Sequence, residues 1–562
     1  MTYTVGSYLA RRLQQIGLKH HFAVAGDFNL VLLDQLLTVK ELEQVYCCNE
    51  LNCGYSAEGY ARACGAAAAV VTFSVGGLSA INAIGGAYAE NLPVILVSGA
   101  PNSNDRATEH LIHHTLATHD WSYQLEIAKK LTCAAVSINS ATDSPYQIDH
   151  AIRSALRERK PAYIEIACNI ASAPCAAPGP VSAVLGEEPS DPETLRAAIA
   201  AAAEFLRGKQ KPILLIGSKL RAAGAEKQTI ELAEALGCAV TVMAAGKSFF
   251  PEDHPQFAGI YWGEVSAPGA REIFDWADSV VCIGTIFNDY STVGWTALPS
   301  GAGVLTADQH RVYLEGHDFG RVYLRDFLSG LASKVQKRPA TMVEYQRIRP
   351  HPQPQQSAEP DAKLTRAEIF RQVQALINAD TTVIAETGDS WFNGMALKLP
   401  GGARFEIEMQ WGSIGWCVPA AFGYSLGLEP DRRLVAAIGD GSFQLTAQEV
   451  SNMIRHGQEI LIYLVNNRGY VIESAIHDGP YNYYNNWDYA GLIDVFNADD
   501  GHGLGLTATT PTELADAIAK ARAHKGGPVL IECQIPNEDA SPEVISWGSK
   551  VARVNARPPQ NI

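Results

Sequence analysis

Several features are scarce in this chain, and each scarcity excludes a class of protein. Lysine and arginine number 44 against 60 acidic residues, and the resulting net charge of −16 disfavours a nucleic-acid partner. No apolar run of about 18 residues is free of polar breaks, so no membrane span is expected. The first residues lack the charged-then-apolar pattern of a secretion signal, and we therefore expect a cytoplasmic protein.

Cysteine pairs of the kind that hold zinc or exchange disulfides are also missing. The 11 cysteines include no Cys-x-x-Cys pair, which is the spacing typical of such sites. Cys47 and Cys48 lie in a strand-like run, where successive side chains face opposite sides of a sheet. We therefore expect small buried hydrophobes rather than a metal site around Cys47, Cys48 and Cys53.

The chain does contain a regular alternation of strand-like and helix-like segments. Its 562 residues exceed one hydrophobic core and indicate about three or four domains. Runs such as "PVILVSGA" alternate with 3.6-period segments such as "GLSAINAIGGAYA", a rhythm typical of doubly wound parallel sheets. Two proline-rich stretches, 172–193 and 338–363, are interpreted as linkers. The sequence thus predicts three doubly wound α/β domains, over residues 1–185, 190–340 and 355–562.

Polar residues end two neighbouring apolar runs in the last of these domains. "RLVAAIGD" ends in Asp440, and "EILIYLV" is followed by two asparagines, the second of which is Asn467. Ligands of such sheets bind beyond the carboxyl ends of the strands, so we expect these two residues to meet at one crevice. Between them, Thr446 and Glu449 are predicted to form a capping box, and Gly457 to end the helix.

Oxygen atoms at such a crevice are suited to a hard cation. Carboxylate and amide oxygens are the ligands that magnesium prefers, and the backbone amides of Gly441, Ser442 and Phe443 lead into a helix start. A metal that bridges a diphosphate follows from this pattern. In the alternative, Asp440 only caps a turn and the asparagines only end a strand, which either motif alone would favour. The two motifs together favour the metal site.

The motif GDG, followed at this spacing by two asparagines, is the signature of thiamine diphosphate enzymes, which the chain resembles along its full length. Within them it is most similar to the 2-oxo acid decarboxylases, of the bacterial pyruvate decarboxylase type. The matching segments are "HHFAVAGDFNLVLLDQLL", "CCNELNCGYSAEGYARA", "GAYAENLPVIL", "ETGDSWFN", "GDGSFQLTAQEV" and "IHDGPYN". The resemblance implies non-oxidative decarboxylation of a 2-oxo acid, pyruvate first, with thiamine diphosphate and Mg²⁺.

The resemblance also implies an architecture. The domain over 1–185 is expected to bind the pyrimidine of the cofactor, that over 355–562 its diphosphate, and that over 190–340 to lie between them. The cofactor of this family lies between domains of two different chains. A homo-oligomer, usually a dimer of dimers, is therefore implied.

Individual site residues follow from the same resemblance. Asp440, Asn467 and the carbonyl of Gly469 are expected to hold magnesium. Glu50 is expected to face the aminopyrimidine as a proton-carrying acid, although without the resemblance it would be a glutamate that stabilises a helix N-terminus. The residues expected to contact the cofactor are Glu50, Thr387, Asp389, Gly412, Ser413, Ile414, Asp440, Gly441, Ser442, Phe443 and Asn467. Among them, the carbonyl of Gly412 would accept a hydrogen bond from the exocyclic amine, and Ile414 would hold the cofactor bent.

Proton transfers near neutral pH require groups with displaced pKa values, and the resemblance assigns them to Asp27, His113, His114 and Glu473. From pattern alone, Asp27 could cap a turn and Glu473 could be a solvated helix acid. The histidine pair follows a strand on the side where ligands bind. The earlier pair, His20–His21, precedes its strand and lies at the wrong end for a ligand.

Bulky residues are expected to set the size of the substrate. By resemblance, Tyr290, Trp391, Ile472 and Ile476 line the substrate pocket and favour pyruvate over phenylpyruvate or indolepyruvate. A methylene changes selectivity by only about 10–200-fold, so larger aliphatic 2-oxo acids remain possible substrates. A ligase of the acetolactate synthase kind and a non-catalytic family member also stay open as hypotheses.

The chain departs from the bacterial pattern at three places. Ser413 stands where those relatives commonly have histidine, and Glu109 where they usually have glycine. The segment "IGTIFNDYS" replaces a more usual "APVFNDYS" near Tyr290. None of these departures removes a proposed catalytic group, but they leave the rate and the pH optimum open.

Overall fold

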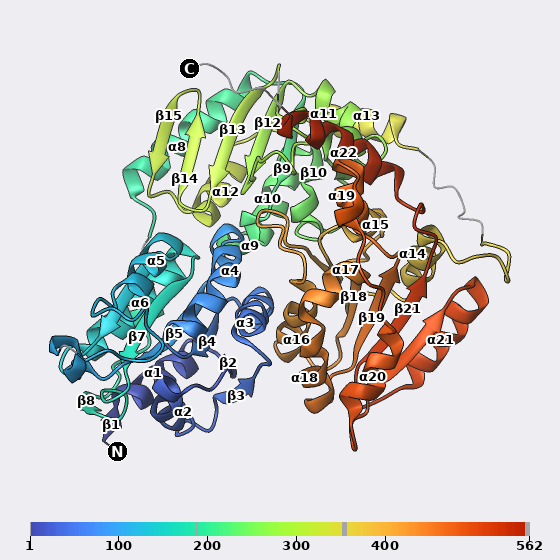
Figure 1. Ribbon diagram of the computed structural model, residues 1–562. Coiled ribbons are helices and arrows are strands. Elements are labelled where there is room, and N and C mark those ends of the chain that lie inside the picture. Colours follow the sequence, from blue (N-terminus) through green and yellow to red (C-terminus); the bar gives the residue numbers. More distant parts are fainter. Residues whose placement is uncertain (1, 109, 186–188, 300, 351–356, 557–562) are drawn as a thin grey trace.

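Three sheets, each flanked by helices, follow one another along the chain (Figure 1). The computed structural model describes residues 2–108, 110–185, 189–299, 301–350 and 357–556. We name the three parts the N-terminal, middle and C-terminal units. In Figure 1 the blue N-terminal unit lies beside the orange-red C-terminal unit, with the green middle unit above both.

The N-terminal unit is built on a six-stranded sheet in which all strands are parallel. Its strands are, in spatial order, β3 (Glu43–Tyr46), β2 (His20–Ala23), β4 (Ala67–Val71), β5 (Val94–Ala100), β7 (Ala162–Ala167) and β6 (Ala134–Ile138). Its helices are α1 (Val5–Gln15), α2 (Leu30–Leu36), α3 (Glu50–Cys64), α4 (Val75–Ala89), α5 (Tyr123–Leu131), α6 (Ser144–Glu158) and α7 (Ser182–Leu185). The central strands β4 and β5 are buried along their whole length, as expected for parallel strands covered by helices on both faces.

The middle unit has a seven-stranded sheet with one antiparallel edge. Its strands are, in spatial order, β11 (Phe257–Ile260), β10 (Ala239–Val242), β9 (Pro212–Ile216), β12 (Ser279–Ile283), β13 (Gly303–Asp308), β14 (Arg311–Leu314) and β15 (His317–Gly320). The first five are parallel, whereas β13, β14 and β15 form antiparallel pairs. Its helices are α8 (Pro192–Arg207), α9 (Lys219–Ala223), α10 (Glu226–Leu236), α11 (Ala270–Trp276), α12 (Leu324–Ala332) and α13 (Ala340–Ile348).

The C-terminal unit again has six parallel strands. In spatial order they are β17 (Arg404–Glu406), β16 (Thr381–Ala385), β18 (Arg433–Gly439), β19 (Ile460–Asn466), β21 (Val529–Gln534) and β20 (Leu504–Ala508). Its helices are α14 (Arg366–Gln374), α15 (Asp389–Ala396), α16 (Cys417–Leu426), α17 (Asp440–Thr446), α18 (Val450–Arg455), α19 (Val471–Ile476), α20 (Tyr489–Asn497), α21 (Pro511–Ala523) and α22 (Pro542–Asn555). The predicted fold class of three parallel α/β parts is confirmed.

Helices α3 and α16 join the N-terminal and C-terminal units at close range. A Cβ atom at Gly59 would lie 2.0 Å from the carbonyl oxygen of Ala420, and one at Gly423 would lie 1.8 Å from that of Ser56. Real Cβ atoms do not approach oxygen so closely, so both glycines allow the helix backbones to touch. This contact fixes the relative position of the two units.

Both stretches predicted to be linkers lie between the sheets of successive units, and both contain secondary structure. In the first, β8 (Pro174–Cys175) pairs antiparallel with β1 (Tyr3–Thr4). In the second, helix α13 is held to the middle sheet, because Thr341 Oγ1 donates to Pro212 O (2.7 Å) and accepts from Ala239 N (3.0 Å). The domain boundaries drawn from the sequence stay a prediction.

The prediction of a capping box at Thr446 and Glu449 is wrong, because the Thr446 side chain makes no cap hydrogen bond. Thr446 Oγ1 donates to Gly415 O (2.6 Å), and the Glu449 carboxylate accepts from Cys48 N (3.2 Å) and Asn52 Nδ2 (2.9 Å) of the N-terminal unit. Tertiary partners therefore take both side chains away from the local helix end.

Two smaller expectations can be placed as well. Strand β3 ends at Tyr46, so Cys47 and Cys48 follow the strand rather than alternate within it. The departure at Glu109 lies outside the described residues. No helix among the described residues is long and apolar enough to cross a membrane.

Candidate active site

The carboxyl ends of β18 and β19 meet beneath a pocket in the C-terminal unit. Gly439, the last residue of β18, pairs with Val465 of β19, so the residues that follow each strand lie at one sheet edge. Asp440 and Asn467 lie together there, and the amide of Arg468 donates to Asp440 Oδ2 (2.7 Å). The loop after β19 is thereby tied to the end of β18.

The side-chain amide of Asn467, the carbonyl oxygen of Gly469 and the carboxylate of Asp440 converge at this edge. The side-chain oxygen of Asn467 lies 2.9 Å from Gly469 O and 3.1 Å from Asp440 Oδ1. Turning the amide by 180° would replace these contacts by two N–H donations. A divalent cation would satisfy the present orientation instead, because carboxylate, amide and carbonyl oxygens are its preferred ligands.

Helix α17 begins directly after β18, with Asp440 in its first turn. Asp440 is 1% exposed, and burial raises its pKa to about 6. The amide of Gly441 donates to Asp440 Oδ1 (3.0 Å). First-turn amides of a helix have no intrahelical acceptor, so those of Ser442 and Phe443 are available to an anion, whereas that of Gly441 is taken by Asp440.

A pocket of about 180 Å³ opens above these groups. Its lining is Phe370, Thr387, Gly388, Asp389, Ser390, Asn393, Ile414, Gly439, Asp440, Gly441, Ser442, Val465, Asn467, Gly469, Tyr470, Val471, Ile472, Glu473 and Ile535. Most of the C-terminal residues expected at the cofactor are among them. The buried hydroxyl of Thr387 has no hydrogen-bond partner, whereas the Asp389 carboxylate accepts from the hydroxyl of Ser541. Burial raises the pKa of Asp389.

Five C-terminal residues from the predicted set lie outside this lining. Gly412 and Ser413 precede Ile414 in the loop before α16, and Gly412 has a φ of +68° that favours glycine. The side chain of Ser413 is held by Tyr55, whose hydroxyl donates to Ser413 Oγ (2.6 Å). Phe443 is fully buried, and its ring packs edge-on against Tyr489.

The remaining two, Trp391 and Ile476, pack behind the pocket with Tyr290 of the middle unit. Trp391 is fully buried, and its ring centroid lies 6.5 Å from that of Tyr290. Ile476 is partly buried against the same apolar cluster. Burial raises the pKa of Tyr290, and the nearby charges of Glu473 and Asp289 raise it further. Ile472 and Glu473, by contrast, line the pocket directly.

Sequence reasoning missed the carboxylate that holds two walls of the pocket together. Glu386 is fully buried; its Oε1 accepts from Thr387 N (2.8 Å) and its Oε2 from Cys417 N (2.9 Å). It therefore links the turn at Thr387 to the start of α16, just after Ile414. Burial raises its pKa to about 7. Its place one residue before "TGD" was the available signal.

Two tyrosines beside the start of α17 were also missed. A Cβ at Gly441 would lie 2.5 Å from the ring of Tyr470 and 2.6 Å from the hydroxyl of Tyr484. The two tyrosine rings contact each other at 4.8 Å between centroids. Glycine is thus required at 441 by tertiary neighbours, which no local pattern could have revealed.

The four N-terminal residues of the predicted set lie outside the lining of the pocket. Asp27 opens the short 3₁₀ helix Asp27–Asn29 after β2, and the histidines follow β5. His113 Nε2 lies 2.5 Å from Asp27 Oδ2, and His114 Nε2 lies 3.6 Å from Asp27 Oδ1. His113 stacks on Phe28, with ring centroids 4.8 Å apart.

Exposure distinguishes this cluster from the pocket. The side chains of Asp27 and His113 are 46% and 62% exposed. By contrast His21, at the amino end of β2, is fully buried and bonds to Gln44 Nε2 (3.1 Å). The first histidine pair thus belongs to the core and the second to the surface.

Glu50 is the first residue of α3, after the N-cap Asn49. It is partly buried, and a Cβ at Gly76 in α4 would lie 3.0 Å from its Oε1. Both expectations for this residue, a helix-start acid and a site acid, are compatible with that position. It lies in the N-terminal unit with Asp27 and the histidine pair.

Comparison with protein families identifies three matching segments. Residues 3–123 match the thiamine pyrophosphate (TPP) enzyme N-terminal TPP binding domain, 199–313 the central domain, and 390–533 the C-terminal TPP binding domain. Thiamine pyrophosphate is another name for thiamine diphosphate. The three matches lie in the order of the three sheets.

Full-length relatives share much of the sequence. The chain is 55% identical over 560 residues to pyruvate decarboxylase of Neurospora crassa, covering 100% of this chain and 98% of the relative. It is 47% identical to pyruvate decarboxylase 1 of Pisum sativum, covering 99% and 94% of the two chains. A probable pyruvate decarboxylase of Schizosaccharomyces pombe is 55% identical, with 99% and 98% covered.

A solved structure shares the fold at lower identity. It is that of a protein from Mycobacterium smegmatis described as thiamin diphosphate-dependent, with a TM-score of 0.76 and 23% identity. The match covers 95% of this chain and 99% of that one. At this identity the likeness concerns the fold alone.

Proposed function

We infer that this chain, which belongs to the thiamine pyrophosphate enzyme family, decarboxylates pyruvate to acetaldehyde and CO₂ with thiamine diphosphate and Mg²⁺. Relatives named pyruvate decarboxylase match it over nearly their whole length. We assign residues 1–185 to the pyrimidine, 355–562 to the diphosphate, and 190–340 to a middle domain.

The meeting of the Asp440 carboxylate, the Asn467 side-chain amide and the Gly469 carbonyl at one sheet edge carries the cofactor assignment. A magnesium ion held there would replace repulsion between the oxygens by attraction and keep Asp440 ionised. The neighbouring first-turn amides and the unpartnered hydroxyl of Thr387 offer donors to phosphate oxygens. The residues present therefore fit a magnesium diphosphate group.

The other residues are assigned to the pyrimidine end and to proton transfer. Glu50 would face the aminopyrimidine, the Gly412 carbonyl would accept from its amine, and Ile414 would pack against it. When bound, thiamine diphosphate supplies an electron sink for the pair left by the departing CO₂. Asp27, with His113 and His114, and Glu473 on the pocket wall, would hold or move protons.

The separation of the pocket in the C-terminal unit from the proposed proton-transfer residues of the N-terminal unit supports a site shared between two chains. Glu473 lines the pocket, whereas Asp27, His113 and Glu50 do not. Large apolar side chains are exposed in both regions, among them Leu30, Val75, Leu111 and Leu116 in the N-terminal unit and Leu445, Tyr481 and Tyr483 in the C-terminal unit. We propose that a second copy covers them and supplies the missing half of each site, and that two such dimers form a tetramer.

Substrate size is assigned to the wall formed by Ile472 and the layer behind it. Ile472 is 6% exposed and lines the pocket, with Trp391 and Tyr290 packed behind. This crowding supports pyruvate over phenylpyruvate or indolepyruvate.

The 11 free cysteines, none of them in a disulfide, support a cytoplasmic location, which cell fractionation tests.

Aldehyde formation tests the proposed function directly. Purified protein is stripped of cofactor and metal, resupplied with thiamine diphosphate and Mg²⁺, and assayed with pyruvate through added alcohol dehydrogenase and NADH. We expect activity only after resupply. Aldehyde from phenylpyruvate alone would change the substrate, acetolactate as the product would indicate a ligase, and silence with all substrates would indicate a non-catalytic member.

Mixing two inactive variants tests the shared site. A chain with Glu50→Gln and a chain with Glu473→Gln are unfolded together, refolded and compared with each variant refolded alone. A mixed dimer has one site with both substitutions and one with neither, so mixing should restore activity. No recovery in a mixture shown to contain mixed dimers would place both residues in one chain's site.

A further inference from the structure

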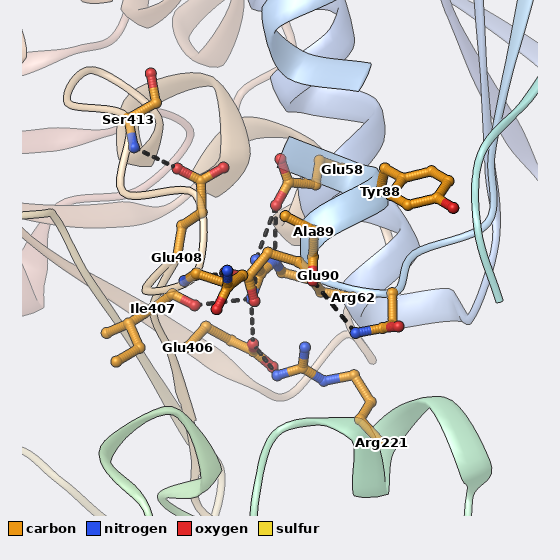
Figure 2. Close-up of polar contacts among 12 residues, drawn as sticks. Glu58, Arg62, Tyr88, Ala89, Glu90, Arg221, Glu406, Ile407, Glu408 and Ser413 are labelled. Atoms are coloured by element: carbon orange, nitrogen blue, oxygen red, sulfur yellow. Dashed lines mark hydrogen bonds and ion pairs between the residues drawn. The ribbon is translucent and has the colours of Figure 1, made fainter. Parts of the chain in front are cut away.

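A cluster of buried charges lies where the three units meet, outside the pocket. We call it the junction cluster; its members are Glu58, Arg62, Glu90, Arg221, Glu406 and Glu408 (Figure 2). Glu58 and Arg62 come from α3, and Glu90 follows α4. Arg221 comes from α9 of the middle unit, and Glu406 ends β17.

The cluster holds more carboxyl than guanidinium groups. Arg62 donates to Glu58 Oε1 (2.8 Å), to Glu406 Oε2 (3.3 Å) and to Ile407 O (3.0 Å). Arg221 also donates to Glu406. The four carboxyls thus share two guanidinium groups. An unpaired carboxylate is costly to bury, so the excess favours bound protons.

One oxygen of Glu58 and one of Glu408 face the same spot. Both side chains are fully buried, and no well-aligned donor reaches Glu58 Oε2 or Glu408 Oε1, although the indole N–H of Trp416 lies near Glu58 and lowers its pKa. A Cβ at Gly86 would lie 2.6 Å from Glu408 Oε1 and 3.2 Å from Glu58 Oε2. The glycine in α4 leaves the space that these two oxygens occupy. A single proton between the two carboxyls would satisfy both.

Burial disfavours the charged form of both groups. It raises the pKa of Glu58 to about 7, against the lowering effect of Arg62. It also raises the pKa of Glu408 well above its usual range, and the charges of Glu58 and Glu90 raise it further. The charged and titratable groups facing the pair are Tyr55 and Arg62 from α3, Glu90 after α4, Glu406 with Arg221, and Glu386 beyond Tyr55.

The second oxygen of Glu408 reaches the loop beside the pocket. Glu408 Oε2 accepts from the backbone amide of Ser413 (2.9 Å), as Figure 2 shows. That amide and the carbonyl of Gly412 belong to one peptide unit, which is trans. In a trans peptide the N–H and C=O bonds point in opposite directions, so fixing the amide also fixes the carbonyl. A charged acceptor on the amide polarises the unit and makes the carbonyl a stronger acceptor.

We infer that Glu408 is a positioning residue, which shares a proton with Glu58 and thereby sets the direction and strength of the Gly412 carbonyl. The inference rests on the proposed function, in which that carbonyl accepts from the exocyclic amine of thiamine diphosphate. Protonation of Glu408 weakens the carbonyl as an acceptor, and ionisation strengthens it. The protonation of a buried carboxyl outside the pocket thus changes the strength of one hydrogen bond to the cofactor.

Two isosteric substitutions separate the two states of the pair. In Glu408→Gln the amide oxygen can still accept from Ser413 N, and its NH₂ can donate to Glu58, which mimics a protonated Glu408. In Glu58→Gln the NH₂ can donate to Glu408, which keeps Glu408 ionised. Glu459→Gln, at an exposed glutamate paired with Lys525, serves as the matched control.

The readout is cofactor binding rather than turnover. Calorimetry with Mg²⁺ compares thiamine diphosphate with an analogue that lacks the exocyclic amine, and the ratio of the two affinities isolates the carbonyl contact. Glu408→Gln should reduce this ratio about tenfold, since a hydrogen bond that loses charge assistance weakens by about that factor. Glu58→Gln should retain the ratio of the unsubstituted protein or exceed it, and Glu459→Gln should leave it unchanged.

The dependence on pH gives a second test that survives if Glu408→Gln does not fold. In the unsubstituted protein the ratio should rise with increasing pH, as the shared proton is lost. In Glu58→Gln it should be high and constant. The infrared band of protonated carboxyls should be weaker in this variant than in the unsubstituted protein, by the contribution of one carboxyl.

The outcomes separate this inference from the proposed function. Failure of the unsubstituted protein to bind thiamine diphosphate would overturn the proposed function. Binding with a preference for the amine, but with equal ratios in all folded variants or an unchanged pH dependence in Glu58→Gln, would overturn the role of Glu408 alone.

Discussion

The pocket of the C-terminal unit and the histidine cluster of the N-terminal unit differ in how far one chain completes them. At the pocket, Asp440 is 1% exposed and its oxygens are bonded to backbone amides. At the cluster, the side chains of Asp27 and His113 are 46% and 62% exposed. A proton-transfer group is most effective where water is excluded. The oxygen groups around Asp440 are thus assembled within one chain, whereas the histidine cluster awaits a covering surface.

The largest expected loss of activity comes from a substitution at Asp440 in the pocket of the C-terminal unit. Asp440→Asn keeps the shape of the side chain but removes the charge that faces Asn467 and Gly469. Loss of one preorganised polar group costs about 10²–10³-fold, and a charged metal ligand should reach the upper end. Magnesium titration of activity measures the effect. Normal activity at low magnesium would show that the metal binds elsewhere. Asp494→Asn, at an exposed acid of α20 outside the pocket lining, is the control.

A smaller loss of turnover is expected from a substitution in the histidine cluster of the N-terminal unit. Asp27→Asn removes the charge bonded to His113 while His114 remains, so turnover should fall about 10²-fold, at the low end for general acid–base groups. Affinity for magnesium diphosphate should stay unchanged, because Asp27 does not line the pocket. Parallel measurements of kcat and of cofactor affinity check this split. A matching loss of cofactor affinity would contradict the assignment.

Substrate choice should respond to the pocket wall by a smaller factor. Ile472→Ala removes bulk that faces the pocket, so the ratio of kcat/KM for 2-oxobutyrate and longer 2-oxo acids to that for pyruvate should rise about tenfold. Ile493→Ala, a truncation in the core away from the lining, controls for lost packing. If both variants leave the ratio unchanged, another wall sets substrate size.

The smallest expected effect is on the pH dependence of the thermal stability, through the buried Glu386. Burial raises the pKa of Glu386 to about 7 from its ordinary 4.5, so the folded protein binds a proton that the unfolded chain has released. Stability from this group is therefore present at low pH and lost as pH rises from about 5 through about 7. Glu386→Gln should flatten the fall in apparent Tm over this window by a few degrees.

Thermal scans of the apo protein at several pH values measure this slope. The exposed Glu459→Gln should retain the slope of the unsubstituted protein. An unchanged slope in Glu386→Gln would assign the pH response to other buried carboxyls, Glu58 and Glu408 first.

Much of the fold and of the pocket could be predicted from the sequence. Continuous apolar runs such as "AAAAVV" and "PVILV" became the buried strands β4 and β5, because period and composition act within one segment. Asp440 and Asn467 could be placed together since parallel neighbouring strands end at the same edge. Helix α13 in the second proline-rich stretch could not be predicted, because Thr341 finds its partners on the middle sheet, which proline content does not report.

The sequence by itself determined the three α/β parts and the corner of acid and amide oxygens, because each depends on a short segment and on the geometry of strands. Only the tertiary structure decided which distant groups share a proton or a charge. Asp27 meets His113 across 86 positions, and Glu58 lies near Glu408 from another unit. The exposure and pKa of such groups depend on what packs around them, and packing joins segments that no local period connects.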